Sequence, residues 1–307
     1  MKYITLPDKE SAVSSVIMGC MRIASKTEAE TEALVKTALE LGINTFDHAD
    51  IYGGNHACEK HFGRAVNLRG DIRGRMIIQT KCGITPCGYD FSKQHIIKQT
   101  EDSLSALGTD YADILLLHRP DILMDEYEVG EAFERLSSEG KVRYFGVSNF
   151  NPSQISLLQR GLKQKLIINQ LQFSVAHPLL VNEGMAVNTG TAQGTVHNGG
   201  MLEYARLNDI FLQAWSPFQY GFFGGSFLGN NEKYPELNAS LNSLAEKYGV
   251  SPSAIAAAWI LRLPAKISVV LGTANPVHLA QAARGSDITL TRGEWYALYK
   301  AAGFDIP

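Results

Sequence analysis

The chain has 307 residues, of which 45% are hydrophobic, so it can bury the core of one large α/β domain or two smaller ones. Its net charge of −3 and pI of about 6.2 give no basic excess for binding nucleic acid or an anionic membrane. The first ten residues lack the apolar core of a signal peptide, and no apolar stretch is long enough to span a bilayer. Four cysteines are sparse for a disulfide scaffold, so we expect reduced thiols in a cytoplasmic protein.

Short apolar runs alternate with helix-like stretches along almost the whole chain. Each run is four or five residues long and is bounded by glycine, proline or charged residues, which is typical of strands buried on both faces. The expected strands are Val16–Gly19, Ile43–Phe46, Met76–Thr80, Ile114–Leu117, Tyr144–Val147, Ile167–Leu171, Ile210–Ala214 and Ser268–Leu271.

The stretches between these strands carry the start and stop signals of amphipathic helices. Thr27 suits an N-cap because acidic residues follow it in the first turn, and Gly42 would end that helix. Asn151 and Ser251 each stand directly before a proline, which favours the first helical turn. The expected helices are Thr27–Leu41, Ser92–Leu107, Asp125–Glu139, Pro152–Leu162, Leu237–Tyr248 and Pro252–Leu263.

Eight β-then-α units in order predict a (β/α)₈ TIM barrel, with residues 1–307 as a single domain. A doubly wound sheet would also alternate, but no Gly-x-Gly-x-x-Gly turn follows an early strand. We expect Lys2–Leu6 and Ala12–Ser15 to form a small hairpin that closes the barrel's lower end. Two long connections, residues 174–201 and 217–235, are expected to cover cofactor and substrate at the C-terminal face; exposed insertions without a role are the alternative.

Reactive polar residues stand at the ends of three of the expected strands. Asp47 directly follows the second expected strand and Tyr52 comes soon after it, while Lys81 directly follows the third and His118 directly follows the fourth. The ends of parallel barrel strands meet on one rim, where barrel enzymes keep their catalytic residues. We therefore expect these four side chains to converge.

This set has the composition of a proton-transfer site. A tyrosine has a pKa near 10 and is a poor acid at neutral pH, but a lysine ammonium nearby favours the phenolate. A carboxylate keeps that ammonium charged in a partly dry pocket, and a histidine can orient a substrate oxygen. We therefore expect a tyrosine that can protonate an oxygen as it becomes an alkoxide, as carbonyl reduction requires.

The motifs around these residues resemble the aldo-keto reductase superfamily, and the resemblance runs in order from about Gly19 to the C-terminus. Within that family the chain is most similar to bacterial YdhF-like oxidoreductases, through Ile78–Ile84, Tyr89–Lys93 and Gln170–Ser174. The segments that carry the family resemblance are Gly42–Gly53 with Glu59 and Gly63-Arg64, Gln79–Gly83, Leu116–Asp121, Gly140–Phe150, Asn169-Gln170 and Ala214–Phe218.

The resemblance implies an NAD(P)H-dependent reductase of aldehydes or ketones, in which Tyr52 is the general acid, Lys81 and Asp47 tune it, and His118 positions the carbonyl. Trp215 would stack on the nicotinamide, whose carboxamide would be bound by Ser148, Asn149 and Gln170. Ser216, Pro217 and Phe218 would line the pyrophosphate and ribose. All the cofactor positions that it implies are Gly19, Cys20, Met21, Asp47, Ser148, Asn149, Gln170, Trp215, Ser216, Pro217, Phe218, Gly272, Thr273, Asn275, His278 and Gln281.

The segment implied to meet the adenosine end of the cofactor departs from the family pattern. The family commonly places arginine or lysine there to pair with the 2′-phosphate of NADP, but this chain has Ala274 and His278. Thr273, Asn275 and a partly charged His278 can still bind a phosphate. We favour NADPH, with NADH or use of both left open.

Substrate selectivity is expected to involve Arg22, Ile84 and Arg119, although Arg119 alternatively pairs with Asp121 on the surface. His48 and Asp50 flank Asp47 but lack a second His-x-His pair, so no metal site is expected. Phe222, Phe223 and Phe227 suit either an apolar substrate wall or a loop that packs on its own aromatic rings.

The sequence leaves two other functions open. A regulatory or sensor subunit that binds NADPH but turns it over slowly would share this fold, although the four catalytic positions argue for turnover. A metal hydrolase built on a barrel is the third hypothesis. The sequence makes no prediction of the oligomeric state or of the physiological carbonyl substrate.

Overall fold

A computed structural model describes residues 1–7, 9, 11–222 and 224–307. The chain divides into two compact units. The N-terminal unit comprises Ile17–Gln170 with Gly272–Pro276, and the C-terminal unit comprises Met1–Val16, Leu171–Leu271 and Val277–Pro307. That residues 1–307 act as a single domain stays a prediction.

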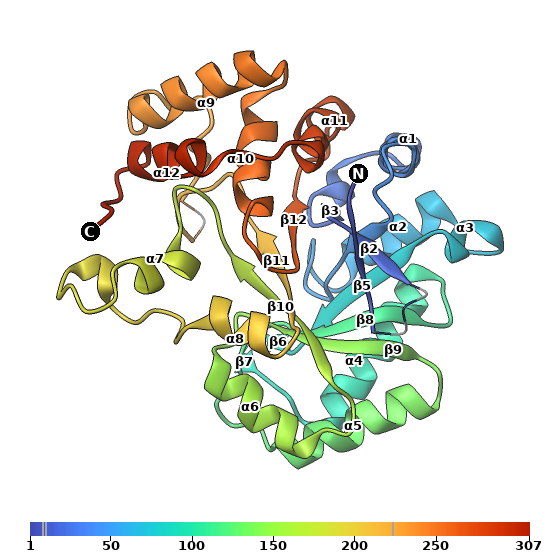
Figure 1. Cartoon of the computed structure of the whole chain (residues 1–307). Coiled ribbons are helices and arrows are strands. Elements are labelled where there is room, and N and C mark those ends of the chain that lie inside the picture. Colours follow the sequence, from blue (N-terminus) through green and yellow to red (C-terminus); the bar gives the residue numbers. More distant parts are fainter. Residues whose placement is uncertain (8, 10, 223) are drawn as a thin grey trace. The chain divides into compact units, whose positions relative to one another are not determined.

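Among the described residues, eight strands form a closed barrel in the order β3-β4-β5-β8-β9-β10-β11-β12 (Figure 1). Neighbouring strands pair in parallel, as β5 and β8 do through Lys81 opposite Leu116. The (β/α)₈ prediction is therefore confirmed, and each expected strand overlaps one that is observed. The barrel strands are β3 (Val16–Gly19), β4 (Thr45–Asp47), β5 (Ile77–Cys82), β8 (Ala112–Leu117), β9 (Val142–Ser148), β10 (Leu166–Gln172), β11 (Phe211–Trp215) and β12 (Ile267–Leu271).

Helices of the N-terminal unit follow the capping signals in the sequence. The Thr27 side chain accepts from the backbone of Glu30, whose carboxylate accepts from the backbone of Thr27, and Asn151 forms the same reciprocal cap with Gln154. Helices α5 and α6 lie side by side outside β8 and β9 (Figure 1). The helices are η1 (Ile23–Ser25), α1 (Glu28–Glu40), α2 (Ala57–Val66), α3 (Asp71–Gly74), α4 (Lys93–Leu107), α5 (Glu126–Ser138) and α6 (Pro152–Gly161).

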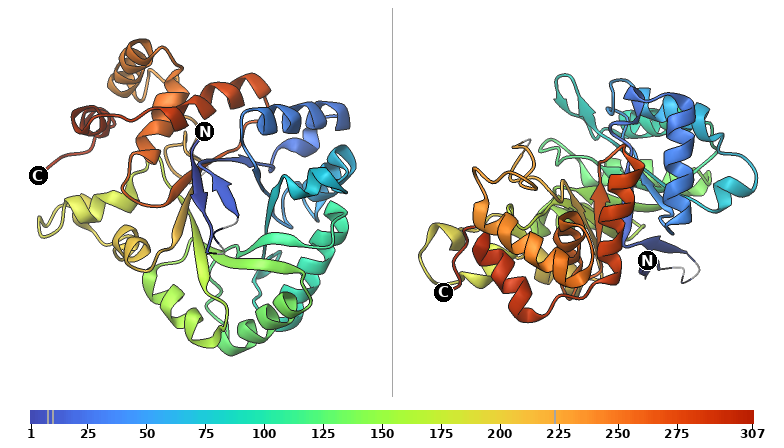
Figure 2. Two further views of the ribbon diagram at one scale, coloured as in Figure 1. Left: turned by 45° about the vertical axis from the view of Figure 1, so that its right-hand side comes forward. Right: turned by 90° about the horizontal axis from the view of Figure 1, so that it is seen from above.

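The C-terminal unit contains the expected hairpin, in which β1 (Tyr3–Thr5) pairs antiparallel with β2 (Ala12–Ser14). In this unit α9, α10 and α12 pack on one another (Figure 2). Its helices, with α11 starting at the last residue of the other unit, are α7 (Leu179–Met185), η2 (Ala192–Gly194), α8 (Met201–Leu207), α9 (Pro235–Tyr248), α10 (Pro252–Leu261), α11 (Pro276–Ala283), η3 (Arg284–Asp287) and α12 (Arg292–Ala301).

The connection over residues 174–201 is more structured than the sequence suggested. It contains α7 and η2, and the Glu183 carboxylate accepts from the backbone N–H groups of His197 at 2.9 Å and Asn198 at 3.0 Å. Gln193 donates to the hydroxyl of Tyr299 at 2.8 Å. The long loop is thereby held to its own helix and to α12, and its role as a cover stays a prediction.

In the connection over residues 217–235, the loop packs on its own aromatic rings. Phe227 is buried, and its ring centroid lies 6.5 Å from that of Tyr234, which is itself 5.4 Å from that of Tyr220. Phe222 is 62% exposed, and Phe223 lies outside the described residues. These contacts favour the self-packing alternative over a wall built for substrate.

Glycine is required at position 83, directly after β5. Its φ of +108° lies where L side chains are strained, and a Cβ there would come within 2.2 Å of the Phe91 ring. The buried Phe91 ring closes over this glycine just beyond the short hairpin of β6 (Ile84–Thr85) and β7 (Gly88–Tyr89), which the sequence did not predict. The turn after Lys81 therefore has a fixed course.

Within the described residues, no helix combines the length and the apolar character needed to cross a membrane.

Candidate active site

Asp47 and Lys81 form a buried ion pair at the ends of β4 and β5. The Lys81 Nζ atom lies 2.7 Å from both Asp47 carboxylate oxygens and 2.9 Å from the backbone oxygen of His48. The side chains are 0% and 1% exposed, so the pair is screened very little by solvent. Burial lowers the pKa of Lys81, but Asp47 and the phenol of Tyr52 together outweigh burial and raise it above its ordinary value. Lys81 is therefore an ammonium at neutral pH.

The Asp47 carboxylate is held by neutral amides as well as by the ammonium. Gln79 and Gln170 both donate to its Oδ1 atom, the latter at 3.1 Å. The backbone N–H of Cys20, just after β3, donates to the backbone oxygen of Asp47 at 2.9 Å. Side chains of two barrel strands, β5 and β10, thus fix the carboxylate, and Gly19 of β3 lies in register opposite Asp47.

Tyr52 completes the cluster from the turn after β4. Lys81 Nζ lies 3.1 Å from its hydroxyl oxygen and 4.8 Å from its ring centroid. Burial raises the pKa of Tyr52, and the charge of Lys81 offsets only part of that increase, because Asp47 acts in the opposite direction. Lys81 thus favours the phenolate as expected, but burial, which the sequence did not reveal, is the larger effect, so the hydroxyl is a protonated phenol at neutral pH.

His118 follows β8 and faces Tyr52 edge-on, with ring centroids 6.0 Å apart. Burial and the neighbouring cations Lys81 and Arg119 hold the pKa of His118 well below its ordinary value, so its ring is neutral. Its Nδ1 atom is buried and has no hydrogen-bond partner among the described residues. The structure thus brings all four predicted residues together, while their catalytic roles stay a prediction.

A group of amide and hydroxyl side chains lies at the ends of β9 and β10. Ser148 Oγ donates to the backbone oxygen of Gln170 at 2.9 Å, and Asn149 Nδ2 donates to Ser148 Oγ at 2.9 Å. Asn149 has a left-handed φ of 64° and also donates to the backbone oxygen of His118 at 3.3 Å. Donors and acceptors together are what a carboxamide, with one oxygen and one NH₂, requires.

The segment Gly272–Pro276 belongs to the same unit and lies beside a basic side chain. Arg22 Nη1 donates to the backbone oxygen of Gly272 at 3.1 Å, and Thr273 Oγ1 accepts from the backbone N–H of Asn275 at 3.1 Å. A guanidinium therefore stands at the segment that the sequence associated with phosphate, where Ala274 offers no charge. The position of Arg22, 250 residues away in sequence, could not be read from spacing alone.

Six of the cofactor positions lie in the C-terminal unit. Trp215 ends β11 with its ring partly exposed and 6.3 Å from that of Phe222. Ser216 follows with a left-handed φ of 49°, an uncommon conformation for a residue with a Cβ. Pro217 and Phe218 continue this turn; His278, on α11, is exposed, and Gln281 lies on the same helix.

The other positions in the N-terminal unit differ in exposure. Of the cofactor positions after β3, Cys20 is buried and Met21 is 40% exposed, while Ile84, a substrate position, is half-buried in β6. Arg119 is half-buried. Asp121, expected on the surface beside Arg119, is buried; its carboxylate accepts from the backbone N–H groups of Phe91 at 3.0 Å and Leu123 at 2.8 Å. Asp121 therefore organises the loop after β8.

Sequence reasoning missed the buried polar groups behind the ion pair. His48 is 0% exposed, and neither of its ring nitrogens has a hydrogen-bond partner among the described residues. Burial, helped by Lys81, lowers the pKa of His48 to about 3, so the ring is neutral. Asp50 is 4% exposed, and burial, helped by Glu59, raises its pKa to about 7. In the sequence, the available signal for these buried groups was the presence of acidic residues before the start of a helix.

Asp50 gives the protein a pH-dependent stability. Its folded pKa of about 7 exceeds the ordinary 3.8, so its contribution is fully present below pH 3.8 and is lost as pH rises through 7. We expect Asp50→Asn, which cannot ionise, to raise the free energy of unfolding at pH 8 by up to about 4 kcal/mol, with the gain disappearing near pH 4.

Urea unfolding at pH 4.5 and pH 8 would measure this difference. Asp110→Asn, at an exposed position, serves as the control. An Asp50→Asn variant that is no more stable than the native chain at pH 8 contradicts the prediction.

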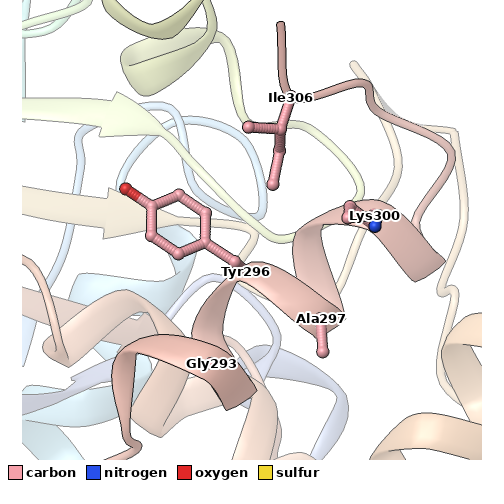
Figure 3. Close-up of a pocket in the computed structure, with 5 residues that line it drawn as sticks. All are labelled: Gly293, Tyr296, Ala297, Lys300 and Ile306. Atoms are coloured by element: carbon pink, nitrogen blue, oxygen red, sulfur yellow. The ribbon is translucent and has the colours of Figure 1, made fainter.

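The described residues contain no group of three or more His, Cys, Asp or Glu side chains that could hold a metal ion. A separate hollow lies on α12 and the C-terminal segment (Figure 3). It is lined by Gly293, Tyr296, Ala297, Lys300 and Ile306, which do not form a set comparable to the one at Lys81.

The whole chain is similar to known proteins in sequence and in fold. A model of the aldo/keto reductase family matches residues 15–302. The oxidoreductase YdhF of Escherichia coli (strain K12) is 36% identical over 100% of both chains, and a 6-dehydroglucose reductase of Agrobacterium fabrum is 36% identical over 98% of both. A solved aldo/keto reductase from Klebsiella pneumoniae, in complex with NADP and acetate, shares the fold with a TM-score of 0.76 at 22% identity, covering 95% of this chain and 92% of that one. The chain belongs to the aldo/keto reductase family.

Proposed function

We propose that this protein reduces an aldehyde or a ketone to an alcohol with NADPH, and that Tyr52 supplies the proton. The observation that carries the proposal is the contact of Lys81 Nζ with Tyr52 Oη at 3.1 Å while the same ammonium is paired with Asp47. A phenol on a buried ammonium is suited to proton transfer, because the ammonium stabilises the phenolate that remains after the proton leaves.

The residues present fit a nicotinamide cofactor. Ser148, Asn149 and Gln170 offer a carboxamide both donors and acceptors, and Arg22 offers charge near residues 272–276. When bound, a reduced nicotinamide supplies two electrons and hydrogen to the carbonyl carbon. The Klebsiella pneumoniae relative was solved in complex with NADP, which supports NADPH for this chain.

Residues of the chain then orient and protonate the carbonyl oxygen. The neutral His118 ring can donate one hydrogen bond to that oxygen and orient it toward the Tyr52 hydroxyl. Tyr52 protonates the oxygen as its negative charge develops. Lys81 stabilises the resulting phenolate, and Asp47 keeps Lys81 charged throughout.

The substrate class is best tested with small carbonyl compounds that include sugar aldehydes. The Agrobacterium fabrum relative is named a 6-dehydroglucose reductase, which supports adding 6-dehydroglucose to a panel of aldehydes, ketones and dicarbonyls. Oxidation of NADPH and NADH would be followed by nicotinamide absorbance for each compound. We expect turnover with at least one; tight NADPH binding without turnover on any would instead favour the regulatory subunit.

For cofactor preference we expect His278→Ala to raise KM for NADPH roughly fivefold while leaving KM for NADH unchanged, because only NADPH carries the 2′-phosphate that this ring can contact. Val277→Ala, at a neighbouring position that is 60% exposed, is the matched control. Steady-state kinetics with both cofactors measure the effect. Equal changes for NADPH and NADH would remove His278 from phosphate recognition.

A further inference from the structure

A second buried network lies behind the active-site cluster and is centred on His56. The His56 side chain is 6% exposed, and its Nδ1 atom lies 2.5 Å from the carboxylate of Glu59, which is fully buried on α2. Its Nε2 atom lies 3.2 Å from Oε1 of Gln99 on α4. Both ring nitrogens therefore face an oxygen acceptor, and an imidazole donates from both nitrogens only as an imidazolium.

The surroundings of the ring favour this charged form. Glu59 raises the pKa of His56 most strongly, burial opposes it, and Asp50 adds to the increase. The acidic groups that face the network are Glu59 and Asp50, and Asp50, with its pKa raised to about 7, ionises only as pH rises through neutrality. Lys81 acts on Asp50, and α4 presents the uncharged Gln99 and Ser103, the latter 3.3 Å from Nδ1.

His56 is tied to the turn that carries Tyr52. Its backbone N–H donates to the backbone oxygen of Asp50 at 2.7 Å, and the backbone N–H of Cys58 donates to that of Tyr52 at 3.0 Å. Asn55 and His56 both have left-handed backbones, with φ of 42° and 61°, which residues with a Cβ adopt at some cost. The turn therefore depends on side-chain contacts to keep its course.

The same network reaches the strand that carries Lys81. Thr80, one residue before Lys81, donates through its hydroxyl to Glu59, while the backbone N–H of Asp50 donates to the backbone oxygen of Lys81 at 3.1 Å. Because side chains alternate along a strand, Thr80 faces α2 and Lys81 faces the site. Glu59 thus connects His56 at the turn with β5.

We propose that His56 is a positioning residue for the proposed reaction: as an imidazolium held between Glu59 and Gln99, it fixes the turn over residues 50–58 and thereby the contact of Tyr52 with Lys81. The inference rests on the proposed function for its kinetic consequence. Among the described residues, no hydrogen bond or ion pair joins the ring to the four active-site side chains, so it acts through Glu59 and the backbone of the turn.

Kinetics of His56→Ala and His56→Gln test the role. We expect His56→Ala to lower kcat about tenfold, because a small displacement of Tyr52 costs rate, while KM for NADPH stays unchanged. Glutamine can donate to Glu59 but carries no charge, so His56→Gln should be slower than the native chain at pH 6, and the difference should shrink as rising pH removes the proton from the native ring. His95→Ala on α4 is the control histidine.

Two measurements decide the same point without turnover. In NMR titrations the His56 ring should titrate above pH 6.5, its ordinary value. Amide hydrogen exchange over residues 50–58 should be slow at pH 6 in the native chain and faster in His56→Ala after correction for the intrinsic rate. Because these readouts need no substrate, failure of every carbonyl substrate would overturn the proposed function and leave the structural role of His56 separately measurable.

Several results would overturn the inference. One is a His56→Ala variant with native kcat and native exchange; another is a variant whose thermal stability falls while kcat is kept. A His56 ring that titrates at or below pH 6.5 would also contradict it. If His56→Ala fails to fold, the ratio of native to His56→Gln activity still decides when it is followed from pH 6 through the His56 pKa found by NMR, because a constant ratio excludes the charged ring.

Discussion

Replacing Tyr52 with phenylalanine is expected to lower kcat by about 10²–10⁴-fold, because the substitution removes the hydroxyl that is placed to give a proton beside Lys81. The phenyl ring keeps the volume and the edge-on contact with His118, so NADPH affinity should change by less than about twofold. Steady-state kinetics and a fluorescence titration with NADPH measure the two quantities separately. Retained turnover in Tyr52→Phe would exclude Tyr52 as the proton donor.

The pKa of Tyr52 adds a pH dependence to this prediction. Burial raises that pKa, so the phenol keeps its proton across the neutral range. We expect the rate of carbonyl reduction to be nearly flat from pH 6 to pH 8 with respect to this group, and to fall at alkaline pH when the phenol ionises. Tyr111→Phe provides the control, since the Tyr111 ring lies under Arg73 and Arg143 and not at the Asp47–Lys81 ion pair.

Replacing Lys81 with methionine is expected to remove both activity and stability. The Asp47 carboxylate would remain buried with no cation, and breaking a buried ion pair by deleting one partner costs about 3–5 kcal/mol. The loss of activity follows because the phenolate of Tyr52 would lose its counter-charge. Urea unfolding and kinetics on the same preparations measure both effects.

Two further variants separate the causes of that loss. Lys98→Met breaks an ion pair with Asp102 in which the side chains are 69% and 43% exposed, and it should cost no more than about 1 kcal/mol. Adding Asp47→Asn to Lys81→Met should recover part of the stability, because the uncompensated charge is gone, but none of the rate. A Lys81→Met chain as stable as the native chain would mean that the pair is not the buried contact described.

The sequence predicted the barrel and the four central residues because their signals are local. A short apolar run that is followed by Asp47 or Lys81 indicates where a strand ends. In a parallel barrel, the ends of the strands meet at one rim. Helix α2 was missed because its N-cap position is occupied by His56, whose side chain bonds to Glu59 instead of capping a backbone N–H. That arrangement leaves none of the usual capping residues to read.

The sequence could not predict which of the polar side chains are buried. The direction of the Tyr52 pKa depends on whether lost solvation or the Lys81 charge is the larger effect, and only the packed structure decides. Asp121 was expected on the surface but is enclosed by backbone N–H groups that come from Phe91 and Leu123. In each of these cases the interacting residues belong to different segments, and the sequence patterns of those segments do not indicate that they meet.

The division of the chain after Gln170 has a consequence for recombination between related genes. The residues that bond to the Asp47 carboxylate, from Gln79 and Lys81 to Gln170 itself, all precede that point. Trp215 and His278 follow it. A crossover at residue 170 would therefore transfer the Asp47–Lys81 cluster as one inheritable piece, while exchanging the half that carries Trp215 and His278.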